Sequence, residues 1–421
     1  MTDLDVVEIC AGAGGQALGL ERAGFEHALA VELDPDACGT LRANRPGWKV
    51  AEGDVADLAL WRPRDYRGVA LLAGGVPCPP FTVAGRQLGA TDERDLFAWA
   101  VELCEIVRPR ALLLENVRGL STNRFSAYRQ HVLDRLRELG YVPGWRLLQA
   151  SDFGVPQLRP RTVLVALCPA DAPWFRWPAP SARSAATVGE TLADLMAARG
   201  WPGADAWARR ADRIAPTIVG GSKKHGGADL GPTRAKRAWA ELGTDGIGIA
   251  DAAPGPDADP ALVPRLTCEM VIRLQGWQDE WGWRFGGRKT ARYRQIANAF
   301  PPPVAESVGT AIRRALEHAG PPEAAEASVV PLHDPVFRVL RSRRDFLTAR
   351  QIAELAACAA AETVTAGAVL GRLRHLGQDF ELEIADSRDG PAYRLGSFKA
   401  FVGQREHDRH QRFATSRATV S

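Results

Sequence analysis

Short apolar runs alternate with amphipathic stretches over the first 170 residues of the chain. Strands are predicted at residues 5–9, 28–32, 69–73, 111–114 and 162–167, and those at 69–73 and 111–114 are continuous apolar runs. Runs of this length are typical of parallel strands that are buried on both faces. Helical patterns lie between and after them, at residues 16–23, 35–44, 96–107 and 125–139. This alternation of strand and helix predicts an α/β fold with a doubly wound sheet.

The pattern changes after Cys168. Proline, tryptophan and glycine become frequent, and helical periodicity weakens until about Leu262. Regular patterning resumes near Thr267. A long irregular stretch inside a compact domain is usually a functional insertion. We therefore expect one α/β domain formed by residues 1–168 and 264–318, interrupted by a smaller irregular domain over residues 169–263.

A separate unit is expected near the C-terminus. Residues 319–334 have the Pro, Ala and Glu content of a linker, and residues 399–421 are polar and rich in Arg and His. This composition predicts a disordered tail. The intervening residues 335–398 are expected to form a small domain of their own.

Within that small domain the patterns predict three helices followed by a hairpin. The helices are expected at residues 337–346, 349–360 and 366–376, the last ended by Gly377, and the strands at residues 380–384 and 392–395. This order resembles a winged helix-turn-helix, whose third helix would bring Arg372, Arg374 and His375 to a DNA groove. The alternative is a protein-interaction or dimerisation module, because Glu381 and Glu383 in the hairpin would repel phosphate.

Composition excludes several classes of protein. Apolar residues make up 46% of the 421 residues and charged residues 24%, which is ordinary for a globular protein. The sequence has no apolar run near the ~20 residues that a membrane helix needs, and its acidic start is unlike a signal peptide. The seven cysteines are an odd number without a CxxC pair. We therefore expect reduced thiols, a cytoplasmic protein, and neither disulfide framework nor metal site.

Positive charge is concentrated in one segment. The formal net charge of the chain is +3, but residues 205–240 hold eight basic and three acidic side chains. Such a patch indicates a directed contact with a polyanion, although a solvated loop is the simpler alternative. The candidate contact residues are Arg213, Lys223, Lys224, Arg234, Lys236 and Arg237.

The first predicted strand runs into a turn rich in glycine. Gly12, Gly14 and Gly15 lie between this strand and the next helix, where glycine lets the backbone approach a nucleotide-like ligand. Glu32 ends the second strand, about 20 residues later, where a carboxylate can bind ribose hydroxyls. Asp54 offers another carboxylate at the same edge. The combination fits a cofactor that contains adenosine, either a dinucleotide or S-adenosylmethionine.

A cysteine and a carboxylate follow two further strands. Cys78 lies in a Pro-Cys-Pro-Pro loop after the strand at 69–73, and prolines fix such a loop and disfavour deep burial. Glu115 directly follows the predicted strand at 111–114. Ligands of open α/β sheets bind at this edge. A thiol and a carboxyl that face the same crevice are a plausible catalytic pair.

These residues and several later motifs resemble the DNA cytosine-5 methyltransferases. The resemblance rests on motifs in the family's order from residue 5 to about 316: the glycine turn, Pro77-Cys78, Glu115-Asn116-Val117, Gln157-x-Arg159-x-Arg161, Leu266-Thr267-x-Glu269, Arg273-Leu274-Gln275-Gly276, and Gln295-x-x-Asn298-Ala299-x-Pro301. Several motifs in one order are far more specific than any motif alone.

The resemblance implies a Rossmann-like methyltransferase fold that transfers a methyl group from S-adenosylmethionine to C5 of a cytosine in duplex DNA. Cys78 would be the nucleophile that adds to C6 of a flipped-out cytosine, Glu115 would contact N3, and Arg159 and Arg161 would supply positive charge. The region 169–263 would recognise the target sequence, and Gln275 would contact DNA. The implied cofactor-binding residues are Cys10, Ala11, Gly12, Gly14, Gly15, Glu32, Leu33, Asp54, Val55, Pro77, Asn298 and Ala299.

Four positions depart from the family pattern. Cys10 replaces a phenylalanine that lies on the adenine, which could weaken cofactor binding by ~1 kcal/mol. Pro79 replaces a glutamine and removes one side-chain contact to DNA. Cys268 replaces an arginine and Ala297 replaces a glycine. None of the four removes a group that the reaction requires.

Two other functions are compatible with the motifs. An RNA cytosine methyltransferase would use the same chemistry, but the RNA-directed relatives tend to lack a long insert, so the ~95 residues here favour DNA. A DNA-binding regulator with an inactive core is the second alternative, and the intact Cys78, Glu115 and Arg161 argue against it. We expect a monomeric methylase of a restriction-modification system, whose cognate restriction endonuclease is encoded separately.

Overall fold

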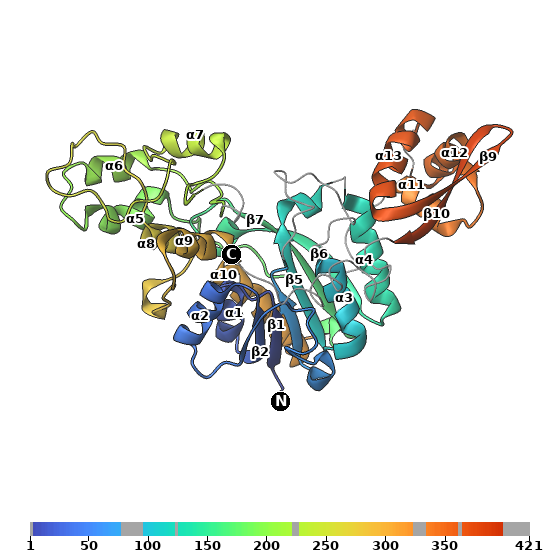
Figure 1. The fold of residues 1–421 in the computed structure, drawn as a ribbon, viewed down its shortest axis with the longest axis horizontal. Helices are drawn as coiled ribbons and strands as arrows, with labels where there is room; N and C mark the ends of the chain where they lie inside the picture. The colour runs from blue at the N-terminus through green and yellow to red at the C-terminus, as the bar shows by residue number, and fades with distance from the viewer. Residues whose placement is uncertain are drawn as a thin grey trace.

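The computed structural model describes residues 3–76, 96–122, 125–220, 227–322, 334–360 and 364–398. Its centre is a seven-stranded sheet of order β3-β2-β1-β4-β5-β7-β6 (Figure 1). The strands are β1 (Asp5–Ile9), β2 (Glu26–Glu32), β3 (Val50–Glu52), β4 (Leu71–Gly74), β5 (Ala111–Val117), β6 (Val142–Gln149) and β7 (Pro160–Leu167). The first five in spatial order are parallel, and β7 is antiparallel to both of its neighbours. The predicted α/β class is confirmed.

Helices cover both faces of the sheet because its strands are apolar on both faces. Val6, Leu71 and Leu113 pack toward α1 (Gly15–Arg22) and α10 (Pro302–Leu316). Their neighbours Val7 and Leu72 belong to the core formed with α3 (Leu96–Val107) and α4 (Ser126–Glu138). The period of two along each strand therefore divides its side chains between two cores.

Sequence patterns missed the edge strands β3 and β6. β6 pairs antiparallel with β7 over its whole length, but it mixes Pro143, Gly144 and Arg146 with apolar residues. A strand with one partner needs no continuous apolar run, so hydrophobic patterning gives it a weak signal.

Most of residues 169–263 forms an arm on one side of the sheet (Figure 1, left), which we call the recognition arm because the resemblance predicts target recognition there. Ala172, Trp174 and Trp177 instead pack in the core that includes β7 and α10. The expectation of an irregular region was partly wrong, because the arm contains α5 (Val188–Ala197), α6 (Ala204–Arg210) and α7 (Thr233–Glu241). Thr187 and Glu190 form a capping box that starts α5. The arm shares a core with α2 (Pro35–Asn44), α8 (Cys268–Leu274) and α9 (Lys289–Asn298) of the main domain.

Residues 334–398 form a second arm on the opposite side, the C-terminal arm (Figure 1, right). Its elements are α11 (Pro335–Ser342), β8 (Leu347–Thr348), α12 (Ala349–Ala360), α13 (Ala366–Asp379), β9 (Phe380–Ser387) and β10 (Gly390–Phe398), with the strand order β8-β10-β9. The three predicted helices and the hairpin are present. Gly377 does not end α13, which continues to Asp379. The expected linker lies mostly, and the expected tail entirely, outside the described residues.

The C-terminal arm is attached to α4. The ring of His131 stacks on Phe398 at 4.0 Å and meets Phe380 edge-on at 5.5 Å. Arg341 forms ion pairs with Asp134 and Glu138 of α4, at 3.2 and 3.3 Å. The arm and the catalytic domain therefore share one continuous core.

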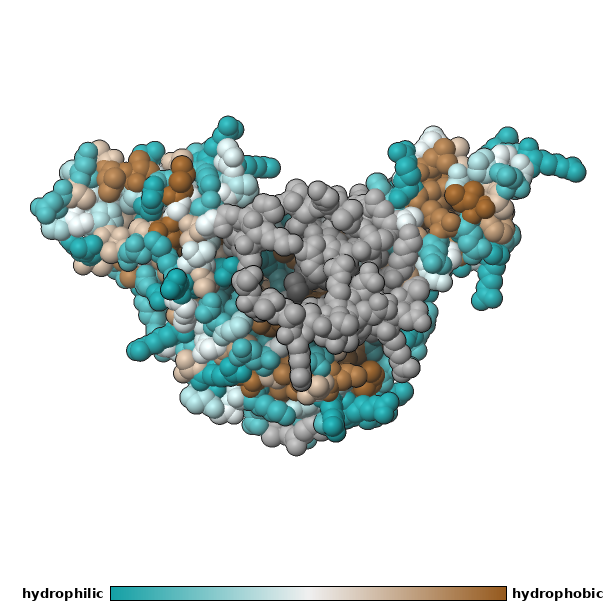
Figure 2. All heavy atoms as spheres, viewed as in Figure 1, coloured by the Kyte–Doolittle hydropathy of each residue, from teal (hydrophilic) through white to brown (hydrophobic). Residues whose placement is uncertain are grey.

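The space-filling view shows apolar residues on the face of the C-terminal arm that is turned to the viewer (Figure 2). Phe346, Leu370 and Ile384 of this arm are at least one-third exposed.

Within the described parts of the chain, every helix is too short or too polar to cross a membrane.

Candidate active site

The turn after β1 has a backbone shape that requires glycine. Gly12 and Gly14 have φ values of 56° and 92°, in the left-handed region that disfavours other residues. A Cβ atom on Gly14 would lie 2.4 Å from the ring of Trp283. The Trp283 indole also donates to the carbonyl of Ala13 at 3.1 Å. Gly14 therefore serves the packing of the turn against Trp283, and α1 begins immediately after it.

Glu32 closes the other side of this turn. Its Oε2 accepts from the backbone N–H of Gly12 at 2.7 Å, and its Oε1 accepts from that of Asp34 at 2.8 Å. Burial raises the pKa of Glu32, and the two backbone donors only partly oppose this shift. The carboxylate is thus held at the end of β2 by two N–H groups.

A cavity of about 310 Å³ opens between these residues and the end of α9. Its lining includes ten of the predicted cofactor-binding residues: Cys10, Ala11, Gly12, Gly15, Glu32, Leu33, Asp54, Val55, Asn298 and Ala299. Gly14 is not part of the lining, and Pro77 lies outside the described residues. The sequence patterns missed Gln16, Leu96, Arg294 and Phe300, which also line the cavity. The first three are helical, and spacing alone does not show which side of a helix faces a cavity.

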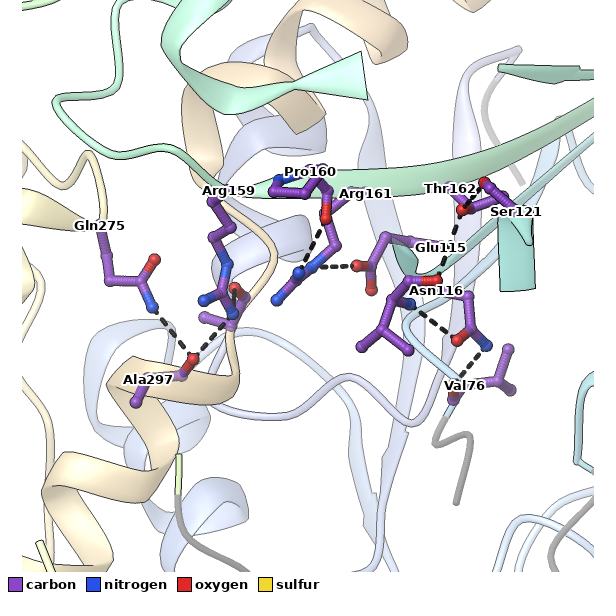
Figure 3. Close-up of polar contacts among 12 residues, drawn as sticks. Val76, Glu115, Asn116, Ser121, Arg159, Pro160, Arg161, Thr162, Gln275 and Ala297 are labelled. Atoms are coloured by element: carbon purple, nitrogen blue, oxygen red, sulfur yellow. Dashed lines mark hydrogen bonds and ion pairs between the residues drawn. The ribbon is translucent and has the colours of Figure 1, made fainter. Parts of the chain in front are cut away.

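Glu115 lies in the same cavity, at the end of β5 (Figure 3). Arg161, from the antiparallel neighbour β7, places its Nε 2.7 Å from Glu115 Oε1, and each side chain is 10% exposed. Burial raises the pKa of Glu115, and the positive charges of Arg161 and Arg159 lower it by less. Glu115 is therefore a carboxyl group with a raised pKa, and the guanidinium of Arg161 holds it in position.

Neighbouring polar contacts hold the end of β5. Asn116 donates from Nδ2 to the carbonyl of Val76 at 3.3 Å, and its Oδ1 accepts from the backbone N–H of Val117 at 2.7 Å. Val76 is the last described residue before Pro77 and Cys78. The predicted nucleophile Cys78 therefore lies outside the described residues, but the strand end that leads to it is tied to Glu115 by Asn116.

Arg159 has a different environment from Arg161. Its side chain is buried and donates to the carbonyls of Ile218, Ala297 and Ala299, at 2.7, 2.7 and 3.0 Å. Burial lowers the pKa of Arg159, as does the nearby charge of Arg161. The predicted direct catalytic role is not supported by these contacts, since the guanidinium is engaged with backbone that joins the recognition arm to α9.

Gln275 is also an interior residue. It is 0% exposed, and its Nε2 donates to the carbonyls of Ile296 and Ala297 at 2.9 and 3.1 Å. Its Oε1 accepts from Gln157, which in turn accepts from the backbone N–H of Ile218. The predicted contact of Gln275 with DNA is therefore not supported, because its polar atoms are used inside the protein.

Comparison with known proteins decides the family. The family model of C-5 cytosine-specific DNA methylases matches residues 4–314. The chain belongs to this family. It is a DNA cytosine-5 methyltransferase, as the motifs predicted.

Two relatives of this methylase are named Type II methyltransferases. M.NaeI from Lentzea aerocolonigenes is 60% identical over 421 residues, which is the full length of both chains. M.NgoMIV from Neisseria gonorrhoeae is 49% identical over 314 residues, which cover 74% of this chain and 97% of that protein. About a quarter of the methylase thus has no counterpart in the Neisseria relative.

A solved structure shows the same fold. It is described as a DNA modification methyltransferase encoded within a prophage of E. coli, and it matches with a TM-score of 0.51 and 22% identity. The match covers 75% of the methylase and 99% of that chain.

The predicted DNA-contacting side chains of the methylase lie mainly on or near α7. Arg234 and Arg237 are exposed and three residues apart on this helix. Lys236 forms an ion pair with Asp229 at 2.8 Å, and Arg213 forms one with Glu241 at 3.1 Å. Lys223 and Lys224 lie outside the described residues. Within the described part of the arm, Arg234 and Arg237 are thus the predicted cations without an ion-pair partner.

Proposed function

We propose that this methylase uses S-adenosylmethionine to methylate C5 of a flipped-out cytosine in a specific duplex sequence, through a covalent bond between Cys78 and C6. The observation that carries the proposal is that Glu115, oriented by Arg161, lines the same cavity as the glycine turn and Glu32. A cytosine at Glu115 would thereby lie beside the bound cofactor.

The cavity residues fit this cofactor. Glu32 and Asp54 supply carboxylates suited to ribose hydroxyls, and the glycine turn lets backbone approach the ligand closely. Cys10, Val55 and Leu96 supply apolar or soft surface for an adenine ring. When bound, the cofactor supplies the electrophilic methyl group.

The chain's own residues prepare cytosine for this transfer. The thiolate of Cys78 forms a bond to C6, which makes C5 nucleophilic, while Glu115 hydrogen-bonds or protonates N3 and stabilises the developing charge. After C5 has accepted the methyl group, a base removes the C5 proton, the C5–C6 double bond re-forms and the C6–S bond breaks. Arg161 keeps the carboxyl of Glu115 in position throughout.

The raised pKa of Glu115 has a consequence for the pH profile. A protonated carboxyl can donate to N3, and it loses its proton as the pH rises through its raised pKa. Single-turnover methylation should therefore fall on the alkaline side of the optimum. Glu115→Gln, which keeps a donor at all pH values, should be slower but should lack this decline.

Recognition of the target is assigned to residues 169–263. Arg234, Lys236, Arg237 and Arg213 are proposed to contact phosphates or guanines, with Lys223 and Lys224 retained as candidates. Because Lys236 and Arg213 must exchange an acidic partner for DNA, we expect Arg234 and Arg237 to contribute more.

The names of the two relatives support a role in a restriction-modification system. We infer that the methylase acts as a monomer in the cytoplasm and protects DNA from a separately encoded restriction endonuclease.

The C-terminal arm is proposed to be a winged helix that adds nonspecific DNA affinity, or that binds an operator to repress the protein's own gene. Arg374 and His375 are exposed on α13, whereas Arg372 lies 3.4 Å from Asp334.

A mechanism-based trap tests the proposed reaction. Duplex DNA with 5-fluorocytosine at the target should become covalently attached to the wild-type protein in the presence of cofactor, because fluorine cannot leave as the proton does. Cys78→Ser should abolish both attachment and methyl transfer while it leaves the fold and duplex binding unchanged. Attachment through another cysteine, or near wild-type turnover by the variant, would refute the assignment. Incubation with tRNA and labelled S-adenosylmethionine is the control, and the tRNA should remain unlabelled.

A further inference from the structure

Gln16 is a buried amide without a hydrogen-bond partner in the described parts of the chain. It is the second residue of α1 and is 3% exposed. Neither its Oε1 nor its Nε2 has a hydrogen-bond partner among the residues that the structure describes. Buried amides are nearly always satisfied, since an unpaired donor and acceptor lose their hydrogen bonds to water on folding. An orphaned amide of this kind indicates a partner that is not part of the protein.

The position of Gln16 suggests what that partner is. Gln16 lines the cofactor cavity together with Asn298, Ala299 and Phe300. A Cβ atom on Gly15 would lie 2.4 Å from the carbonyl oxygen of Phe300, so the start of α1 directly abuts this segment. Glu32 and Asp54, the carboxylates suited to ribose, come from the ends of other elements. Gln16 therefore belongs to a part of the lining formed by the helix start and the segment after α9.

The helix start favours negative charge. The backbone N–H groups in the first turn of α1 have no partners within the helix, and the helix dipole attracts an anion to this end. No acidic residue lies in this first turn. A carboxylate beside Gln16 would thus meet both the helix end and the amide Nε2.

We propose that Gln16 binds the amino-acid end of S-adenosylmethionine, with Nε2 donating to the α-carboxylate and Oε1 accepting from the α-ammonium. This inference rests on the proposed cofactor. A neutral amide offers one donor and one acceptor on adjacent atoms, which complements a zwitterion. A charged side chain at the same place would attract one end of the zwitterion and repel the other.

Calorimetric titration with two ligands tests this assignment. S-Adenosylhomocysteine has the amino-acid end, and 5′-deoxy-5′-methylthioadenosine lacks it. Gln16→Met keeps the length of the side chain without its polar atoms, and should weaken binding of the first ligand about tenfold while binding of the second changes less than twofold. Gln16→Glu should weaken the first ligand further, because its carboxylate repels that of the ligand.

The stability of the ligand-free protein is a second readout. Gln16→Met should unfold at the same or a higher temperature than the wild type, because it removes two unpaired polar atoms. Gln275→Met is the matched control: that glutamine is also buried but is hydrogen-bonded within the protein, so its loss should lower the unfolding temperature.

Each other outcome counts against a distinct claim. Equal weakening of both ligands, or no change for either, would overturn the role of Gln16. A ligand-free Gln16→Met protein less stable than the wild type would do so too, since it would show that the amide is satisfied without cofactor. Failure of the wild type to bind S-adenosylhomocysteine would instead overturn the proposed cofactor.

Discussion

The two arms are joined to the catalytic domain by different kinds of contact. The recognition arm is connected through the apolar core that it shares with α2, α8 and α9 and, beside the site, through buried polar groups: Arg159 donates to the carbonyl of Ile218, and Gln157 accepts from its N–H. The C-terminal arm is connected through rings, with Phe398 and Phe380 packed on His131 of α4. The first junction lies two residues before Arg161, just ahead of β7, and the second is on a helix that covers the sheet.

This difference has a physical consequence. Hydrogen bonds are directional, so the polar junction holds Ile218 in register with the strand that carries Arg161. Apolar contacts are less directional and mainly hold the C-terminal arm in place. Changes at the recognition-arm junction should therefore affect chemistry and recognition, whereas changes at the C-terminal junction should affect stability and overall affinity for DNA.

The largest effect is expected from exchanging the recognition arm. Residues 169–263 grafted onto a related methylase of different specificity should move methylation to the target sequence of this protein. Bisulfite sequencing of a plasmid reports the new site. An unchanged target would place sequence readout elsewhere, most plainly in the C-terminal arm, and would reverse the comparison.

Arg159→Met should disrupt the polar junction. It leaves three carbonyls without their charged donor, which should destabilise the protein by roughly 3 kcal/mol. Displacement of the reacting groups should also slow single-turnover methylation by about 100-fold. Urea denaturation and rapid-quench assays measure the two effects. Arg159→Lys, which keeps the charge without the planar fork, should fall between the variant and the wild type. Loss of stability without loss of rate would separate this junction from catalysis.

Deletion of residues 330–421 should have a smaller effect on chemistry. We expect turnover within a few-fold of the wild type, DNA binding weakened about tenfold, and a shallower dependence of affinity on salt. The deletion also uncovers the apolar surface around Tyr128 on α4, so the unfolding temperature should fall by several degrees. Fluorescence anisotropy over a range of salt concentrations and thermal melting test this. An unchanged salt slope with an altered oligomeric state would favour the protein-interaction alternative.

The smallest effect is expected for Arg341→Met. The ion pairs of Arg341 with Asp134 and Glu138 are at the surface of the C-terminal junction, and such pairs contribute about 1 kcal/mol or less. Phe398→Ala, at the same junction, should cost roughly 3 kcal/mol because it removes a buried ring. If thermal melting ranks the two variants in the opposite order, the junction depends on charge rather than on apolar packing.

Much of the fold follows from local sequence. The bounds predicted for β1, α2, α3 and α12 agree with the structure residue for residue, because each element has a clear period and a defined start, such as the Asp34 cap before Pro35 in α2. The glycine turn, Glu32 and Glu115 were also found from sequence, since each directly follows an apolar strand at the edge of the sheet where ligands bind.

Other features depend on which distant segments meet. Arg159 and Arg161 belong to one motif, yet one binds carbonyls up to 140 residues away and the other binds Glu115. Gln275 and Gln16 are both buried glutamines, and only the folded chain shows that the first has partners within the protein and that the second has none among the described residues. Periodicity and turn residues act over a few positions, so the sequence by itself determined the elements and the edge of the sheet where the site lies. The partner of a buried polar group comes from long-range packing, and for that reason only the tertiary structure decided which of these side chains hold the scaffold and which one faces the cofactor cavity unpaired.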